Sequence, residues 1–152
     1  MNQHFDLQKI TRENVAKRIS GLSLDALNEI PAGLSNNLAW NLGHIIVTQQ
    51  LLLYRLSGVN CRIDNEYIER YRKGSRPEGL IVQSEVDFLL QQLVITADLA
   101  RVDFQNKHFG EYKSYTTSYG ITLDSIEKAI MFNNVHESMH LGTMTCLHKL
   151  VG

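Results

Sequence analysis

The sequence predicts an all-α fold, a four-helix bundle in which a long crossover joins the second and third long helices. Four long segments place apolar residues at alternating spacings of three and four, the period of an amphipathic helix. No segment shows the convincing period of two that a half-buried β-strand would need. The only two prolines, Pro31 and Pro77, lie in segments that we predict to be connections. Long helices separated in this way favour a bundle.

Length and cysteine usage predict a single domain over residues 1–152. A chain of 152 residues buries roughly 68–70% of its unfolded surface, so it can fold without disulfides. Cys61 and Cys146 follow no C-x-x-C spacing, which is typical of free thiols in a reducing compartment. We expect Cys146 to be a small buried side chain.

Charge and hydropathy argue against several classes of partner. The formal net charge is −1, and Lys and Arg are scattered among Asp and Glu, so we predict neither a nucleic-acid nor a membrane-surface partner. The start of the chain lacks the basic and apolar regions of a signal peptide, and no apolar run is long enough to span a bilayer. We therefore expect a soluble, cytoplasmic protein.

The first long helix is predicted over about residues 5–19, a modestly amphipathic segment. We place its end there because Ser20 and Gly21 follow, and glycine can end a helix. A short helical turn is expected over residues 23–27. The second long helix is predicted over residues 36–57, with Ser35 or Asn36 as a good N-cap and a glycine just beyond its end.

The second long helix is apolar on two sides, and each side needs a cover. One stripe faces the predicted core and comprises Leu38, Leu42, Ile45, Gln49, Leu52 and Leu56. The other lies on roughly the opposite side and comprises Trp40, Val47, Leu51 and Tyr54. Either a second copy of the chain, in a homodimer, or the crossover would cover this second stripe.

Residues 59–82 are predicted to form the crossover. Antiparallel neighbours in a bundle are usually joined by about two to eight residues, so a longer connection leaves the second and third helices parallel. The third helix is predicted over about residues 84–104 and the fourth over about residues 122–149. Between them, a Tyr-rich linker over residues 108–120 either covers a pocket or packs on the bundle.

Two of the helices carry a polar line with histidines in its middle. On the second helix this line comprises Asn37, Asn41, His44, Thr48, Leu51 and Arg55. On the fourth helix it comprises Ala129, Asn133, His136, His140, Thr143 and Leu147. A bundle that turns both lines inward encloses three imidazoles, and a buried polar group without a partner costs about 1–3 kcal/mol. One divalent metal ion would satisfy all three rings, with amides or hydroxyls as their further partners.

The predicted metal ligands are therefore His44, His136 and His140. The remaining histidines match no such line, and we predict them at the surface or at a helix end: His4, His108 and His148.

Residues 136–140 of the fourth helix also satisfy the pattern H-E-x-x-H, in which two histidines hold zinc and the Glu is a general base. No Asp or Glu follows Glu137 to serve as a third ligand, and the metzincin spacing would need a histidine where the chain has Cys146. A metalloprotease is therefore the weaker hypothesis. Glu137 lies about 100° around the helix from His136. Glu137 has two interpretations. It either supports the metal site, as a general base or by contacting a metal ligand, or it is a hydrogen-bonded structural carboxylate.

Two segments resemble the signatures of the DinB-like (DinB/YfiT) superfamily, namely GLSNNLAWNLGHI over residues 33–45 and HESMHLG over residues 136–142. Helix lengths and the long crossover are also similar, so the resemblance covers nearly the whole chain. It implies an up-down-down-up four-helix bundle, often dimeric, with three histidines holding a divalent metal in an open pocket. Carried over by motif, these are again His44, His136 and His140.

The resemblance also implies a class of reaction. Members of this family include metal-dependent transferases of low-molecular-weight thiols, a maleylpyruvate isomerase that uses such a thiol, and proposed hydrolases, beside many members without an established reaction. A metal-dependent thiol S-transferase or a hydrolase acting on a small molecule is thus the first hypothesis. The metal would be zinc or nickel, both of which suit imidazole, and a low-molecular-weight thiol is a possible cofactor. The second hypothesis is a metal-stabilised bundle or small-molecule binder without chemistry.

Two further residues have two interpretations each. Trp40, one turn before His44, either lines the pocket or packs in the core. Arg55 either contacts an anionic substrate or is an exposed cation at a helix C-terminus.

Overall fold

Six α-helices make up most of the chain in the computed structural model, which describes residues 1–151. The long ones are α1 (Asn2–Ile19), α3 (Leu38–Gln49), α5 (Gln83–Gln105) and α6 (Ile126–Val151). The short ones are α2 (Leu24–Asn28) and α4 (Asn65–Tyr71). The described residues also contain one antiparallel pair of very short strands, β1 (Tyr115–Thr116) and β2 (Thr122–Leu123). The predicted all-α class is therefore confirmed.

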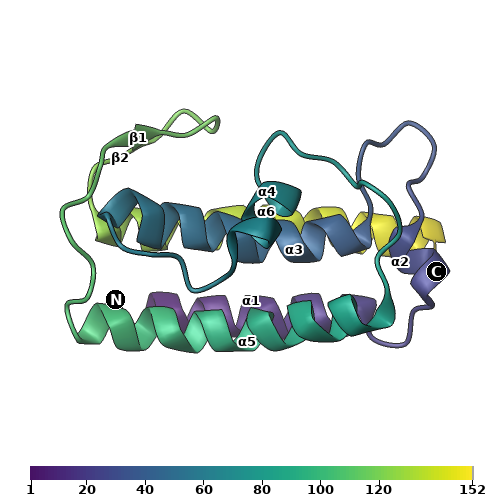
Figure 1. The fold of residues 1–152 in the computed structure, drawn as a ribbon, viewed down its shortest axis with the longest axis horizontal. Helices are drawn as coiled ribbons and strands as arrows, with labels where there is room; N and C mark the ends of the chain where they lie inside the picture. The colour runs from purple at the N-terminus through teal and green to yellow at the C-terminus, as the bar shows by residue number, and fades with distance from the viewer. Residues whose placement is uncertain (152) are drawn as a thin grey trace.

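The four long helices lie alongside one another, and their apolar faces form the core (Figure 1). α1 packs against α5 and α6, and α3 packs against the same two helices. Each long helix therefore has two long neighbours, which bury its apolar residues from two sides. Among residues 1–151, no helix combines the length and the hydropathy of a membrane-spanning segment.

The predicted second helix is one continuous helical stretch that changes its hydrogen-bonding pattern twice. α3 is followed by a π-helical segment, Gln50–Tyr54, and by a single 3-10 turn, Arg55–Ser57. The stretch begins after Asn37, whose side chain accepts a hydrogen bond from the Trp40 amide at 2.8 Å, one residue beyond the predicted cap. Gly58 ends it with a φ of +71°, a conformation that glycine adopts without strain.

The crossover contains a helix that the sequence analysis did not predict. α4 packs on α3, and its Ile68 and Tyr71 belong to the same core cluster as Trp40 and Val47. The second apolar stripe of the long helix is thus buried within the chain except at Leu51, which is half-buried. It provides no argument for a homodimer.

The fourth helix begins at Ile126, four residues later than predicted, because residues 122–123 pair with β1 instead. The turn between the two strands contains Gly120, whose φ is +92°. Leu123 anchors this hairpin, because its side chain is fully buried. From the sequence these residues are predicted to be linker and helix, because strands of two residues are too short to show a period.

The prediction of a buried Cys146 is wrong. Its side chain is exposed, because it lies on the same side of α6 as Met139 and Leu150, and both of these side chains are exposed as well. Cys61 is half-buried, and both cysteines are free.

Candidate metal centre

The two polar lines meet at their histidines. His44 on α3 and His136 and His140 on α6 each offer a ring nitrogen, and these nitrogens lie within 4.8 Å of one another. The ring centroids are 5.1 Å apart for His44 and His136, 4.7 Å for His44 and His140, and 4.5 Å for His136 and His140. The structure thus brings together the three residues predicted as metal ligands. Their role as ligands stays a prediction.

Hydrogen bonds fix the protonated nitrogen of two of these rings. His44 Nδ1 lies 2.7 Å from the carbonyl oxygen of Tyr71, and His140 Nδ1 lies 2.8 Å from Asn41 Oδ1. Both oxygens can only accept, so each Nδ1 carries the hydrogen and donates it. The Nε2 of each of these two neutral rings is therefore unprotonated and carries a lone pair. In His44 this lone pair accepts a hydrogen bond from the Thr48 hydroxyl at 3.3 Å.

The amide of Asn41 is itself held in one orientation. Its Nδ2 donates to the carbonyl oxygen of Asn37 at 2.7 Å and to Asn36 Oδ1 at 3.0 Å. Because the amide nitrogen is committed to these acceptors, the amide oxygen faces His140. The predicted amide and hydroxyl partners thus exist on α3. Their counterparts on α6 bond elsewhere, Asn133 to Glu137 and Thr143 to the carbonyl of Met139.

Burial keeps all three rings neutral. It lowers the pKa of His44, although the hydrogen bond to Tyr71 acts in the opposite direction. Burial, reinforced by His140 and His44, lowers the pKa of His136 to about 2. Burial and the neighbouring His44 lower the pKa of His140 to about 4. Near neutral pH none of the rings carries a proton that a metal ion would have to displace.

The third ring, that of His136, has a nitrogen without a hydrogen-bond partner within residues 1–151. Its Nδ1 is buried and has no hydrogen-bond partner among the described residues. A buried polar atom in this position costs free energy unless something else satisfies the ring. Three neutral imidazoles, two of them oriented by acceptors on the far side, are the donor set that zinc and nickel prefer. The residues present therefore fit a divalent metal ion.

Tyr71 reaches the site from the crossover because α3 has a glycine next to the histidine. A Cβ at Gly43 would stand 2.5 Å from the Tyr71 ring, so only glycine allows the ring this close. At its other end the Tyr71 hydroxyl donates to Glu85 on α5 at 2.6 Å. The tyrosine is thus held at both ends, and its carbonyl is fixed beside His44.

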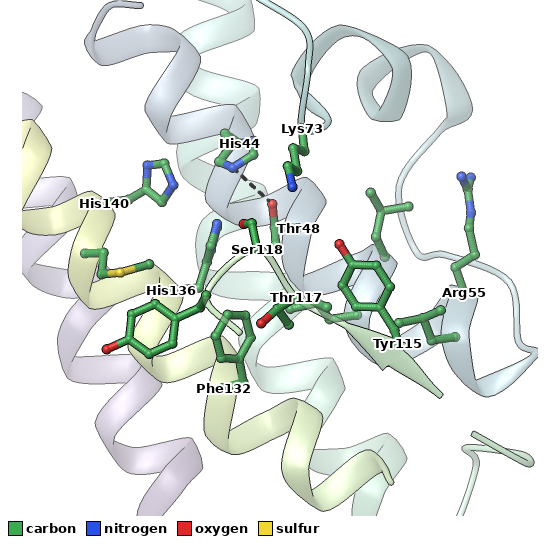
Figure 2. Close-up of a pocket in the computed structure, with 15 residues that line it drawn as sticks. His44, Thr48, Arg55, Lys73, Tyr115, Thr117, Ser118, Phe132, His136 and His140 are labelled. Atoms are coloured by element: carbon green, nitrogen blue, oxygen red, sulfur yellow. Dashed lines mark hydrogen bonds between the residues drawn. The ribbon is translucent and has the colours of Figure 1, made fainter. Parts of the chain in front are cut away.

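A cavity of about 550 Å³ opens beside the three imidazoles (Figure 2). Its volume suits a small organic molecule. The wall combines the three rings and several polar side chains with apolar ones from the helical continuation of α3, the hairpin and α6. The lining residues are His44, Thr48, Leu51, Leu52, Arg55, Leu56, Lys73, Tyr115, Thr117, Ser118, Tyr119, Phe132, His136, Met139 and His140.

The structure bears on the interpretations of three predicted features. The Tyr-rich linker forms the hairpin, and Tyr115 and Tyr119 line the cavity, so the linker covers a pocket. Trp40 packs in the core, with its indole stacked on the His44 ring at 4.4 Å. Arg55 lines the rim, where its guanidinium is 3.4 Å from Asn65 Oδ1.

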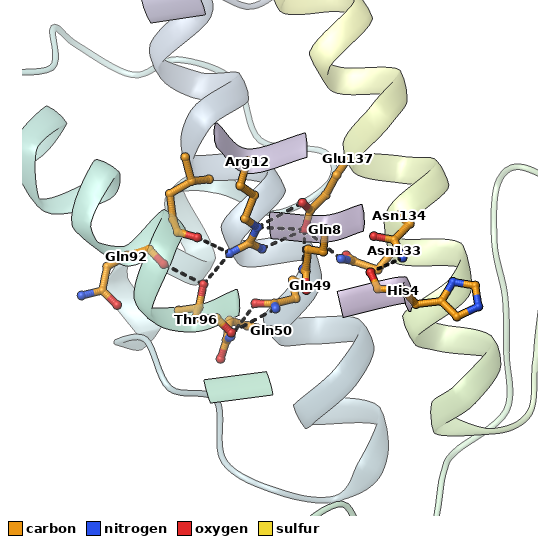
Figure 3. A network of polar contacts seen from close by, with 11 residues as sticks. His4, Gln8, Arg12, Gln49, Gln50, Gln92, Thr96, Asn133, Asn134 and Glu137 are labelled. Atoms are coloured by element: carbon orange, nitrogen blue, oxygen red, sulfur yellow. Dashed lines mark hydrogen bonds and ion pairs between the residues drawn. The ribbon is translucent and has the colours of Figure 1, made fainter. Parts of the chain in front are cut away.

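Glu137 lies in a separate buried cluster that joins α1, α5 and α6 (Figure 3). Its Oε1 accepts from Arg12 and Gln8 at 2.8 Å each and from Asn133 at 2.7 Å. Arg12 also donates to Thr96 on α5 at 2.7 Å. Arg12 is 2% and Glu137 0% exposed, and Glu137 is not among the residues that line the cavity. This geometry fits the structural alternative, and a catalytic role of Glu137 stays a prediction.

Three contributors to the site were missed from the sequence: the Tyr71 carbonyl, Gly43 and Lys73. A backbone carbonyl has no signature, and Lys73 lies in a charged connection among other cations. Gly43 did offer a signal, because a glycine inside a helical pattern usually has a packing or functional reason.

The chain matches a known protein family. A family model described as the DinB superfamily matches residues 9–144, a range that contains all three histidines. No curated protein matches the chain.

Proposed function

The chain belongs to the DinB superfamily, and from this premise we propose that His44, His136 and His140 bind one divalent metal ion at which a small molecule reacts. One observation carries the proposal. Three neutral imidazoles from two helices, of which that of His44 is buried and that of His140 half-buried, converge on the wall of a cavity of about 550 Å³. Metal ligands that open into a cavity of this size support a catalytic rather than a purely structural ion.

The ligand count supports the same conclusion. Within residues 1–151, the group of three histidines includes no Cys, Asp or Glu side chain as a fourth member. A site with three protein ligands leaves positions for water or substrate, whereas structural zinc sites usually have four. A bound zinc or nickel ion would lower the pKa of a water molecule to about 7 or hold a thiolate as the nucleophile.

The proposed reaction is transfer of a low-molecular-weight thiol to a small substrate, or hydrolysis of one. In either case the chain's own residues prepare the site. Tyr71 and Asn41 hold two rings with their Nε2 atoms unprotonated, and the hairpin forms part of the cavity wall. Thr48 and Ser118 place hydroxyls where they can bind polar groups of the substrate.

The alternative is a bundle that binds metal only for stability, or that binds a small molecule without reaction. It uses the same three ligands. It differs in its prediction for turnover, because the metal would then raise the melting temperature without supporting a reaction.

We also propose a topology, a domain assignment, an oligomeric state and a location for this protein. The direction of the colours along the four long helices in Figure 1 supports an up-down-down-up bundle, and we assign residues 1–152 to one domain. Exposed apolar side chains along α1 and α6 support a homodimer: Leu7, Met131, Val135 and Met139. Two free thiols support a cytoplasmic location.

Elemental analysis of protein purified without an affinity tag tests the metal site. We expect about one zinc or nickel ion per chain, loss of the ion in His136→Ala, and retention in His4→Ala, since His4 lies outside the cluster. Comparable metal content in the two variants would contradict the assignment. Thiol-transfer and ester-hydrolysis assays with and without metal then separate the enzyme from the alternative.

A further inference from the structure

The cavity beside the imidazoles is lined by positive but not by negative side chains. Its charged lining residues are Lys73 and Arg55, and neither Asp nor Glu is among the residues of its wall. The three histidines add no negative charge, and a divalent ion held between them would add two positive charges. The cavity therefore favours an anion over a neutral or cationic molecule.

Lys73 is the cation placed at the imidazole end. In Figure 2 its side chain points toward Thr48 and His44, and Ser118 lies close to the same point. No ion pair within residues 1–151 includes Lys73. Its ammonium group is therefore available to a ligand. Arg55, in contrast, lies at the other side of the view and contacts Asn65.

The loop that carries Lys73 is fixed on both sides of it. On one side the Tyr71 carbonyl accepts from His44 at 2.7 Å. On the other, Ser75 Oγ accepts from the Trp40 indole at 3.0 Å and donates toward the carbonyl of Arg70 at 2.7 Å. Because both anchors tie the loop to α3, the lysine is held near the metal ligands.

The rest of the wall is apolar and can take the body of the same ligand. It comprises Leu51, Leu52, Leu56, Phe132 and Met139. Burial of a hydrocarbon body against these side chains would provide affinity, and the polar end would fix the orientation.

We propose that the cavity binds a small organic anion whose charged group pairs with Lys73 beside the imidazoles and whose apolar body packs on this wall. The inference rests on the proposed function for one point only, that the bound anion is the substrate. The binding of the anion itself requires Lys73 and the cavity.

Hexanoate and hexanamide test the proposal, because they share an apolar chain and differ in charge. Each is titrated into ¹⁵N-labelled zinc-loaded and metal-free protein, and binding is followed by the amide signals of the cavity wall and by the indole signal of Trp40, the single tryptophan. We expect hexanoate to bind about tenfold more tightly than hexanamide. Lys73→Gln should lower the affinity for hexanoate by about the same factor and leave that for hexanamide unchanged.

Two variants serve as controls. Lys73→Arg keeps the charge and should keep the affinity for hexanoate within about threefold, and Lys9→Gln removes an exposed cation on α1 and should match the wild type. Equal affinity for the two probes, unchanged hexanoate binding in Lys73→Gln, or no binding of hexanoate to the wild type would each overturn the proposal. Metal content is measured in the same samples. If no metal binds, the proposed function fails, while the comparison of Lys73 variants in metal-free protein still decides this inference.

Discussion

The aromatic ring of Tyr71 lies directly against the backbone of Gly43, where a Cβ would stand 2.5 Å from the nearest ring atom. This contact joins the crossover to the predicted metal centre, because the carbonyl of the same tyrosine accepts the hydrogen bond from His44. The fold of the crossover and the orientation of one imidazole thus depend on the absence of a side chain at a single position.

Gly43→Ala should therefore damage both stability and metal binding. The added methyl group forces the Tyr71 ring away, which we expect to cost about 1–3 kcal/mol of unfolding free energy as overpacking. Loss of the acceptor for His44 should weaken metal binding by about 10–100-fold. Denaturant unfolding and a metal titration measure the two effects. The control is Gly142→Ala on α6, where a Cβ meets nothing within 4 Å and the change should stabilise the helix by roughly 0.5–1 kcal/mol. Equal effects of the two substitutions would contradict this account.

Asn41→Ala should weaken metal binding without a large loss of stability. It removes the acceptor that fixes His140, and partners of this kind typically contribute about 10–100-fold to metal affinity. Competition with a coloured chelator measures the change. Thr143→Ala is the matched control, because Thr143 belongs to the same polar line on α6 yet bonds to the Met139 carbonyl. Thr143→Ala should bind metal like the wild type, and a stronger effect there than at Asn41 would refute the assignment.

Glu137→Gln should be a stability variant. Removing the carboxylate charge leaves the Arg12 guanidinium buried without its counter-ion, which typically costs about 3–5 kcal/mol. We expect metal content and turnover per folded molecule to stay near the wild-type values. Glu127→Gln, at an exposed position of the same helix, should change stability by less than about 0.5 kcal/mol. Retained metal with lost turnover in Glu137→Gln would instead establish the general-base role.

The metal-free protein should lose stability as the pH falls below about 6.5. The pKa values of His44, His136 and His140 are lowered in the folded state, so the unfolded chain binds more protons than the folded chain in acid. By linkage the free energy of unfolding then rises with pH and falls on acidification, between the unfolded value near 6.5 and the folded values. Thermal unfolding at pH 7, 6 and 5 in the presence of a chelator measures this. His136→Gln should reduce the slope and His4→Gln should not; identical slopes in both variants would contradict the burial of His136.

The sequence predicts the helical class and the meeting of the histidines because both depend on periodicity. Alternating spacings of three and four define a face on each long helix. The same helical period places His44, His136 and His140 on the faces that turn toward the core. The pairing of rings 4.5–5.1 Å apart needs only that the two faces meet, and α3 does pack on α6.

The other parts of the site depend on contacts between distant segments that no local pattern reveals. α4 has only seven residues, with no side-chain cap, so its helical propensity is weak and its packing on α3 holds it in place. The hairpin strands have two residues each. The partner of Glu137 is Arg12, 125 positions away in the sequence. Such contacts are set by tertiary packing, and the structure was needed to show them.

The most direct test is an anomalous-diffraction experiment on crystals of the zinc-loaded protein. The account predicts one zinc peak bounded by Nε2 of His44, Nε2 of His140 and a ring nitrogen of His136, with at least one further position open toward the cavity. Zinc bound elsewhere, with only solvent between the three imidazoles, would contradict it.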